Sequence, residues 1–217
     1  MVSGMSKTLN LMPEPPPQSE ELFVTFANTL EYTKGIPLDH VQEPGALLKW
    51  LRQNGLLTER GRASEAQRLQ RDPAEARRRL DRFRYLRDLV HAIAERANDG
   101  HRPTREQIRD LNHVLRHGLH YHQLVSEAEG NRYSVAQVGD HLDQARATIA
   151  NSLANFLAQD DPHRLRTCAN DGCREVFIDR SPTGRRRWCN MRICGNRAKV
   201  ARHRSRARSL PVETGAH

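Results

Sequence analysis

The sequence predicts a mainly α-helical protein with one β-hairpin, which ends in a small separate module. Apolar residues recur at spacings of three and four over several long stretches, as they do on the buried face of a helix. Of the 217 residues, 37% are hydrophobic and 5% are aromatic, so we do not expect a large β-sandwich core. All four cysteines lie between positions 168 and 194, which sets the end of the chain apart from the rest.

The first part of the chain holds two short segments after a leader. Residues 1–20 include a proline-rich run and are predicted to be disordered. Residues 22–30 are apolar and fit either a strand or the first turns of a helix. A short helix is predicted to begin at Pro44, run through Leu51 and end at Gly55, because proline suits the first helical turn and glycine tolerates the conformation that follows a helix.

Two longer helices follow. Asp72 is a good N-cap, and the apolar stripe that begins after it continues until shortly before Gly100. Thr104-x-x-Gln107 has the form of a capping box, so the next helix is predicted to begin at Thr104 and to end near Gly118.

The apolar period changes between Leu119 and Val138. Residues 129–131 (Glu-Gly-Asn) suit the turn of a β-hairpin. A last long helix is predicted over 139–158, and Asp160-Asp161-Pro162 ends it. We therefore expect a leader over 1–20, a helical body over 21–161, a small module over 162–208 and a tail over 209–217.

The cysteines form two pairs of equal spacing. Cys168-x4-Cys173 and Cys189-x4-Cys194 are separated by fifteen residues. Two short loops that each point two sulfurs at one centre are typical of a structural zinc site, because Zn²⁺ is bound tetrahedrally by four thiolates there. We predict one structural zinc ion, with no open position for catalysis. Four unconnected buried thiols, disulfides and an iron–sulfur cluster are the alternatives.

The residues between and after the cysteines fit such a module. Residues 176–178 are predicted to form a strand, 181–184 a turn, 185–188 the return strand and 196–208 a helix. A knuckle, a hairpin and a helix in this order resemble a treble-clef zinc finger. Its small core is predicted to consist of Phe177, Trp188, Ile193 and Val200.

The net charge of +9 comes from the last quarter of the chain. Residues 162–217 hold 14 Lys and Arg against four Asp and Glu, whereas residues 1–161 hold 21 against 22. Such a positive field attracts polyanions, so a nucleic acid is the predicted partner. A solvated helix normally mixes both signs, but after Asp179 the only acid is Glu213. The predicted contact residues are Arg185, Arg186, Arg187, Arg192, Arg197, Lys199, Arg202, Arg204, Arg206 and Arg208.

The module resembles the CGNR zinc finger family. The resemblance rests on residues 168–173, on 187–191 (Arg-Trp-Cys-Asn-Met) and on the intact tetrapeptide Cys194-Gly195-Asn196-Arg197. Proteins of that family usually carry an N-terminal ABATE domain, whose start is similar to Phe26-Ala27-Asn28-Thr29, although Thr25 stands where that domain has an aspartate. The resemblance implies DNA binding and transcriptional control; RNA or ribosome association is the alternative.

Other chemistry is sparse. The chain has no Gly-rich phosphate loop and no nucleophile elbow, so we do not expect an enzyme; a catalytic helical body is the alternative. His113 and His117 lie one helical turn apart and are either surface histidines or a second metal site. We expect a homodimer, with the apolar helix Ala46–Leu51 as an example of an interface, and we leave a small-molecule effector open. No stretch of 18 apolar residues and no secretory signal occur, which indicates a cytoplasmic protein.

Overall fold

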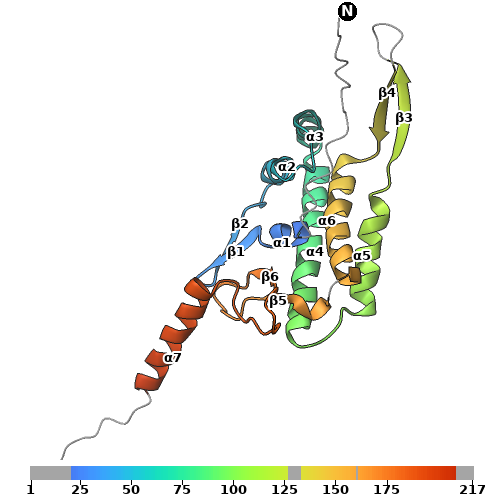
Figure 1. Cartoon of the computed structure of the whole chain (residues 1–217). Coiled ribbons are helices and arrows are strands. Elements are labelled where there is room, and N and C mark those ends of the chain that lie inside the picture. Colours follow the sequence, from blue (N-terminus) through green and yellow to red (C-terminus); the bar gives the residue numbers. More distant parts are fainter. Residues whose placement is uncertain (1–20, 127–132, 160, 209–217) are drawn as a thin grey trace, which may run out of the picture.

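The computed structural model describes residues 21–126, 133–159 and 161–208, with the backbone alone at 136–137 and 204–208 (Figure 1). The predicted leader, the tail and the turn at 129–131 lie outside these residues. The helices are α1 (Leu22–Ala27), α2 (Pro44–Gln53), α3 (Glu59–Arg71), α4 (Pro73–Asn98), α5 (Arg105–His117), α6 (His141–Gln159) and α7 (Asn196–Arg208). The strands are β1 (Leu30–Thr33), β2 (Ile36–Asp39), β3 (Tyr121–Ser126), β4 (Tyr133–Val138), β5 (Leu165–Thr167) and β6 (Val176–Ile178).

Helices α4, α5 and α6 lie side by side and form the body of the molecule (Figure 1). The predicted starts of α4 and α5 are confirmed by cap hydrogen bonds, whereas α6 begins at His141 rather than at 139. The Asp72 carboxylate accepts from the Glu75 N–H at 2.9 Å, and Thr104 and Gln107 bond each other's backbone N–H groups at 3.1 and 2.9 Å. These bonds satisfy N–H groups that have no partner within the helix, which fixes where each helix begins.

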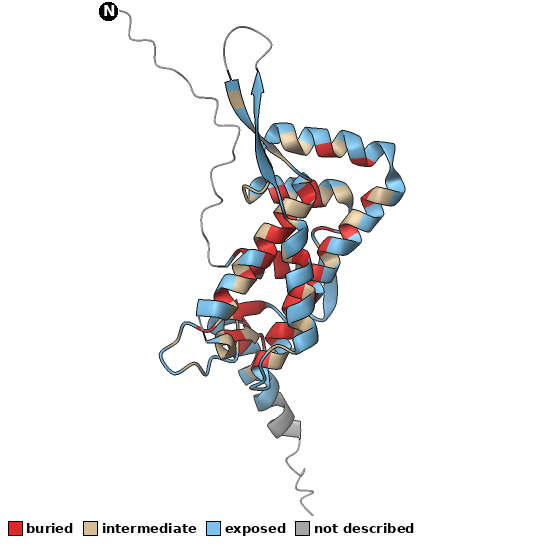
Figure 2. Ribbon diagram, turned by 90° about the vertical axis from the view of Figure 1, so that its right-hand side faces the viewer, coloured by how far each residue is buried: buried red, intermediate tan, exposed pale blue. Residues whose placement is uncertain are grey.

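The core lies where α1 crosses α4 and α6, and buried residues line the inner faces of these helices (Figure 2). Aromatic rings join the elements: Phe23 packs on Phe156 at 5.5 Å between centroids, and Phe26 packs on Phe83 at 6.0 Å and on Trp50 at 5.1 Å. Helix α1 is therefore held by packing rather than by its own six residues.

The apolar segment 22–30 contains both of the alternatives that the sequence left open. It forms α1, and Leu30 then begins β1, which pairs with β2 in antiparallel register. This hairpin was not predicted from the sequence. Its signal was Lys34-Gly35, which takes left-handed conformations (φ 54° and 84°) as a tight hairpin turn requires.

Helix α2 forms as predicted, but the inference that its apolar residues serve as a dimer interface is wrong. Leu47, Leu48 and Leu51 are buried in the core. Helix α3 was missed because it has few apolar residues: only Glu65 and Leu69 are buried, and its start is capped by the Thr58 hydroxyl.

The predicted hairpin of the body forms from β3 and β4, which pair from Tyr121 with Val138 to Ser126 with Tyr133. It extends beyond the ends of α5 and α6 (Figure 1). Every residue of β3 is exposed.

Candidate metal centre and basic surface

The first cysteine pair lies in a knuckle between β5 and β6. The two strands pair across it, and the Cys168 N–H donates to the Glu175 carbonyl at 2.8 Å. Within the loop, the Cys173 N–H donates to the Asn170 carbonyl at 2.8 Å, and Arg174 takes a left-handed conformation (φ 55°). The loop is therefore closed tightly enough to turn both sulfurs to one side.

The second cysteine pair frames a single turn, Met191–Gly195, that leads directly into α7. The Asn190 side chain caps this turn, since its Oδ1 accepts from the N–H groups of Arg192 at 2.9 Å and Ile193 at 3.2 Å. Cys194 is buried at the start of the helix. The orientation of α7 is thus tied to the position of this ligand.

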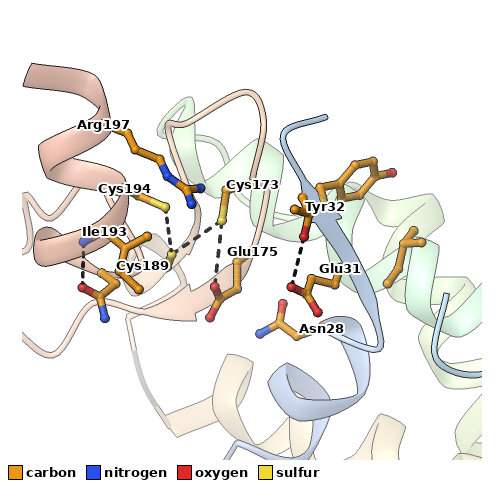
Figure 3. Close-up of a pocket in the computed structure, with 12 residues that line it drawn as sticks. Asn28, Glu31, Tyr32, Cys173, Glu175, Cys189, Ile193, Cys194 and Arg197 are labelled. Carbon is orange, nitrogen blue, oxygen red and sulfur yellow. Dashed lines mark hydrogen bonds between the residues drawn. The ribbon is translucent and has the colours of Figure 1, made fainter. Parts of the chain in front are cut away.

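The four sulfurs converge on one centre. Figure 3 shows three of them, those of Cys173, Cys189 and Cys194. All lie within 4.8 Å of one another, and the Sγ atom of Cys189 is 3.7 Å from that of Cys173 and 3.8 Å from that of Cys194. A tetrahedron with Zn–S bonds of about 2.3 Å has edges of about 3.8 Å. Donor type, number and spacing therefore fit one structural zinc ion held by the four predicted cysteines.

Without metal, the thiols of Cys168, Cys173 and Cys189 hold their protons unequally. A hydrogen bond from the Cys189 thiol lowers the pKa of Cys168 to about 5. Burial raises the pKa of Cys173 to about 12, and the bond to Cys168 together with burial raises the pKa of Cys189. Zinc binding requires all four as thiolates, so it releases the remaining protons.

The predicted return strand over 185–188 is wrong, because strand β6 pairs with β5 instead. Residues 185–188 make only isolated backbone bonds: the Arg186 N–H donates to the buried Asp179 carboxylate at 2.8 Å, and the Ala169 N–H donates to the Arg187 carbonyl at 2.8 Å. The turn before it is confirmed by the bond from Gly184 N to Ser181 O at 3.2 Å.

The predicted core of the module is partly wrong. Phe177 is buried and Trp188 is half-buried, but Ile193 and Val200 are 51% and 50% exposed. The apolar anchors are instead Leu165 and Val176, which belong to the core of the helical body.

Hydrogen bonds and an ion pair also join the module to the body. The Asn28 side chain bonds the backbone of Val176 in both directions at 2.9 Å. Arg174 pairs with Glu95 at 2.7 Å, and Gly35 N donates to the Gly172 carbonyl at 3.2 Å. The β1–β2 hairpin thus reaches the knuckle. A cavity of about 520 Å³ lies between Tyr32, Glu175, Arg197 and three of the cysteines, Cys173, Cys189 and Cys194 (Figure 3).

Comparison with known families matches both parts of this arrangement. A family model named ABATE, with the description "Putative stress-induced transcription regulator", matches residues 20–160. The chain belongs to the ABATE family. A second model, the CGNR zinc finger, matches residues 164–207, so the order of the two parts is the one that the resemblance implied. No curated protein matches the sequence.

The CGNR finger carries the predicted basic residues in three settings. Arg186 is engaged internally, since its guanidinium lies 4.9 Å from the Phe177 ring centroid and its Nε donates to the Trp188 carbonyl at 2.8 Å. Arg202 bonds the Ala198 carbonyl at 3.4 Å within α7. Arg185, Arg187, Arg192, Arg197 and Lys199 are exposed, and residues 204, 206 and 208 lie on α7, where the backbone alone is described.

Two other expectations can be compared with the described residues. His113 and His117 stack on α5 with centroids 4.3 Å apart, but among the residues described only the four cysteines form a converging group of three or more metal-ligating side chains. Within the same part of the chain, no helix is both long and apolar enough to cross a membrane.

Proposed function

We propose that this ABATE protein is a cytoplasmic, DNA-binding transcription regulator whose zinc finger contacts the phosphate backbone through exposed cations and α7. The zinc ion has a structural role in this proposal, because four thiolates leave no coordination position for a substrate. We propose no enzymatic activity for the chain.

A difference in ion pairing carries the proposal. Arginines of the body are mostly paired: Arg68 with Glu65, Arg79 with Glu75, and Arg87 with Asp39. By contrast, six cations that follow Asp179 have no carboxylate within ion-pair distance among the described residues. Two of them, Arg186 and Arg187, lie over aromatic rings, and the other four make no such contact. These are Arg185, Arg192, Arg197 and Lys199. Unpaired cations on one module attract a polyanion without first losing an internal partner.

The shape of the finger supports the same conclusion. Helix α7 points away from the body and contacts chiefly the turn that precedes it (Figure 1). Its sequence has no apolar stripe, and Val200, its largest aliphatic side chain, is half exposed. A helix without a buried face gains little from packing, so contacts with phosphates would stabilise it.

The arginines of the finger that do pair have a separate role. Arg174 binds Glu95 and Arg180 binds Glu21, both on the body side. These pairs hold the finger in a fixed orientation, which leaves the exposed cations on the outside. We therefore assign orientation to Arg174 and Arg180, and phosphate contact to Arg185, Arg192, Arg197 and Lys199.

A binding comparison tests the proposal. Zinc-loaded full-length protein is titrated by fluorescence anisotropy against a duplex DNA pool and a hairpin RNA pool of equal length and equal salt. We expect tighter binding to the duplex DNA, and random-pool selection should then enrich a DNA sequence. Tighter binding to RNA would replace this proposal with an RNA- or ribosome-associated function, and no binding to either would remove both.

A further inference from the structure

A second cavity lies in the body, far from the cysteines in sequence. It has a volume of about 520 Å³ and lies between α4, α5 and α6. This size is within the range of sites that bind small molecules. Its wall includes Arg82, Tyr85, Arg109, His113, Arg116 and Arg146. Four guanidinium groups on one concave wall are unusual unless something negative balances them.

Among these groups, Arg146 on α6 gives the strongest indication of a ligand. It is only 5% exposed, and its Nη2 donates to the Asp143 carboxylate at 3.1 Å. Its Nε is buried and has no hydrogen-bond partner among the described residues. A buried donor without a partner costs stability, so such a group is expected where a ligand completes the bonding.

The protein supplies few negative charges to this wall. Among the described residues that line the cavity, Asp110 is the only carboxylate, and it accepts a hydrogen bond from the Tyr85 hydroxyl at 2.5 Å. Arg109 pairs with Glu106 at 3.2 Å and lies 3.9 Å from Asp110, so its charge is balanced locally. Asp143 does not line the cavity and is shared between Arg79 at 3.0 Å, Arg146 at 3.1 Å and, more distantly, Arg82 at 4.0 Å. Arg116 has no carboxylate partner among the described residues. The cavity therefore keeps an excess of positive charge.

We propose that this cavity binds a small organic oxyanion, a phosphate or carboxylate attached to an aromatic or similarly flat group. Arg82, Arg116 and Arg146 hold the oxyanion by charge-assisted hydrogen bonds, for which a guanidinium is well suited. The Tyr85 ring, which is half exposed, and the buried Val114 side chain accept the apolar part. The site is independent of the proposed DNA contacts, because none of these residues lies in the zinc finger.

Calorimetric titration of the zinc-loaded full chain tests this site. The probes are phenyl phosphate, phthalate and inorganic phosphate at constant ionic strength. We expect one saturable site for an aromatic oxyanion, bound more tightly than inorganic phosphate. The preference between phenyl phosphate and phthalate identifies which oxyanion the site takes.

Two substitutions of equal charge change separate the site from general attraction. R116Q removes an exposed cation from the wall and should weaken binding about tenfold. R105Q removes an exposed cation from the same helix outside the wall and should change affinity less than about twofold. Neither side chain is buried, so both variants should fold. Absence of saturable binding below about 10 mM for all three probes, or equal weakening by both variants, would overturn the proposal.

Discussion

The side-chain amide of Asn28 forms two hydrogen bonds with the backbone of Val176, which lies 148 residues later in the chain. Its Nδ2 donates to the Val176 carbonyl at 2.9 Å, and its Oδ1 accepts from the Val176 N–H at 2.9 Å. The amide thus occupies the place of a neighbouring strand at the edge of β6. Asn28 belongs to Phe26-Ala27-Asn28-Thr29, so this motif joins the body to the zinc finger.

Replacing Asn28 by Ala should destabilise the whole chain. The change leaves the buried Val176 N–H and carbonyl without partners, at a cost of about 2–3 kcal/mol. Urea unfolding followed by circular dichroism measures this. The matched control is N112A on the exposed side of α5, which should cost much less. Equal midpoints for the two variants would show that the finger does not depend on Asn28.

Breaking the ion pair between the buried Arg87 and Asp39 should destabilise the chain even more. The Arg87 guanidinium bonds both Asp39 oxygens, at 2.7 and 2.8 Å, and its side chain is only 4% exposed. D39N leaves this charge uncompensated and should cost about 3 kcal/mol. D81N, which loses an exposed partner of Arg84 on the same helix, should cost no more than about 0.5 kcal/mol. Comparable losses in thermal unfolding would contradict this ranking.

Removal of zinc should affect the body as well as the finger. Elemental analysis should give one zinc per chain, and C189S should hold less than half an equivalent. Because Leu165 and Val176 belong to the main core, C189S should keep its helical circular dichroism at low temperature but melt several degrees earlier. An unchanged melting temperature would mean that the finger folds independently.

Self-association should depend on the β3–β4 hairpin, since the apolar face of α2 is buried. The strands contain no Asp, Glu, Lys or Arg, and Tyr121, Leu124 and Tyr133 are exposed. Uncharged edges of an isolated hairpin favour pairing with a second copy. Light scattering should give twice the 24.9 kDa chain mass, and L124K should reduce it. The control I36K changes an exposed residue of β2 and should leave the mass unchanged. A 24.9 kDa species at all concentrations would contradict a dimer.

The parts of the fold that depend on local signals could be predicted from the sequence. Asp72 and Thr104 marked the starts of α4 and α5, because their side chains cap N–H groups three residues away. The zinc ligands could be predicted for the same reason, since each pair closes one short loop. Helix α3 was not predicted, because only two of its residues, Glu65 and Leu69, are buried and they form no apolar stripe.

The relation between finger and body could not be predicted in this way. Val176 was predicted only as part of a strand in a separate module, but it packs into the main core and bonds Asn28. Neither contact leaves a periodic pattern, because the partners are far apart in the chain. The sequence also could not show that Arg186 is engaged with Phe177 and Trp188 while Arg185 is exposed, since this depends on the path of the loop.

The salt dependence of DNA affinity tests the central claim most directly. If about four of the unpaired cations meet phosphates, the logarithm of affinity should fall with the logarithm of salt at a slope of about −4. R185A/R192A/R197A should reduce that slope to between about −1 and −2. R60A/R77A/R105A removes the same charge from exposed sites of the body and should leave it unchanged. A slope near zero in the wild type, or equal slopes for the two triple variants, would contradict DNA binding through the zinc finger.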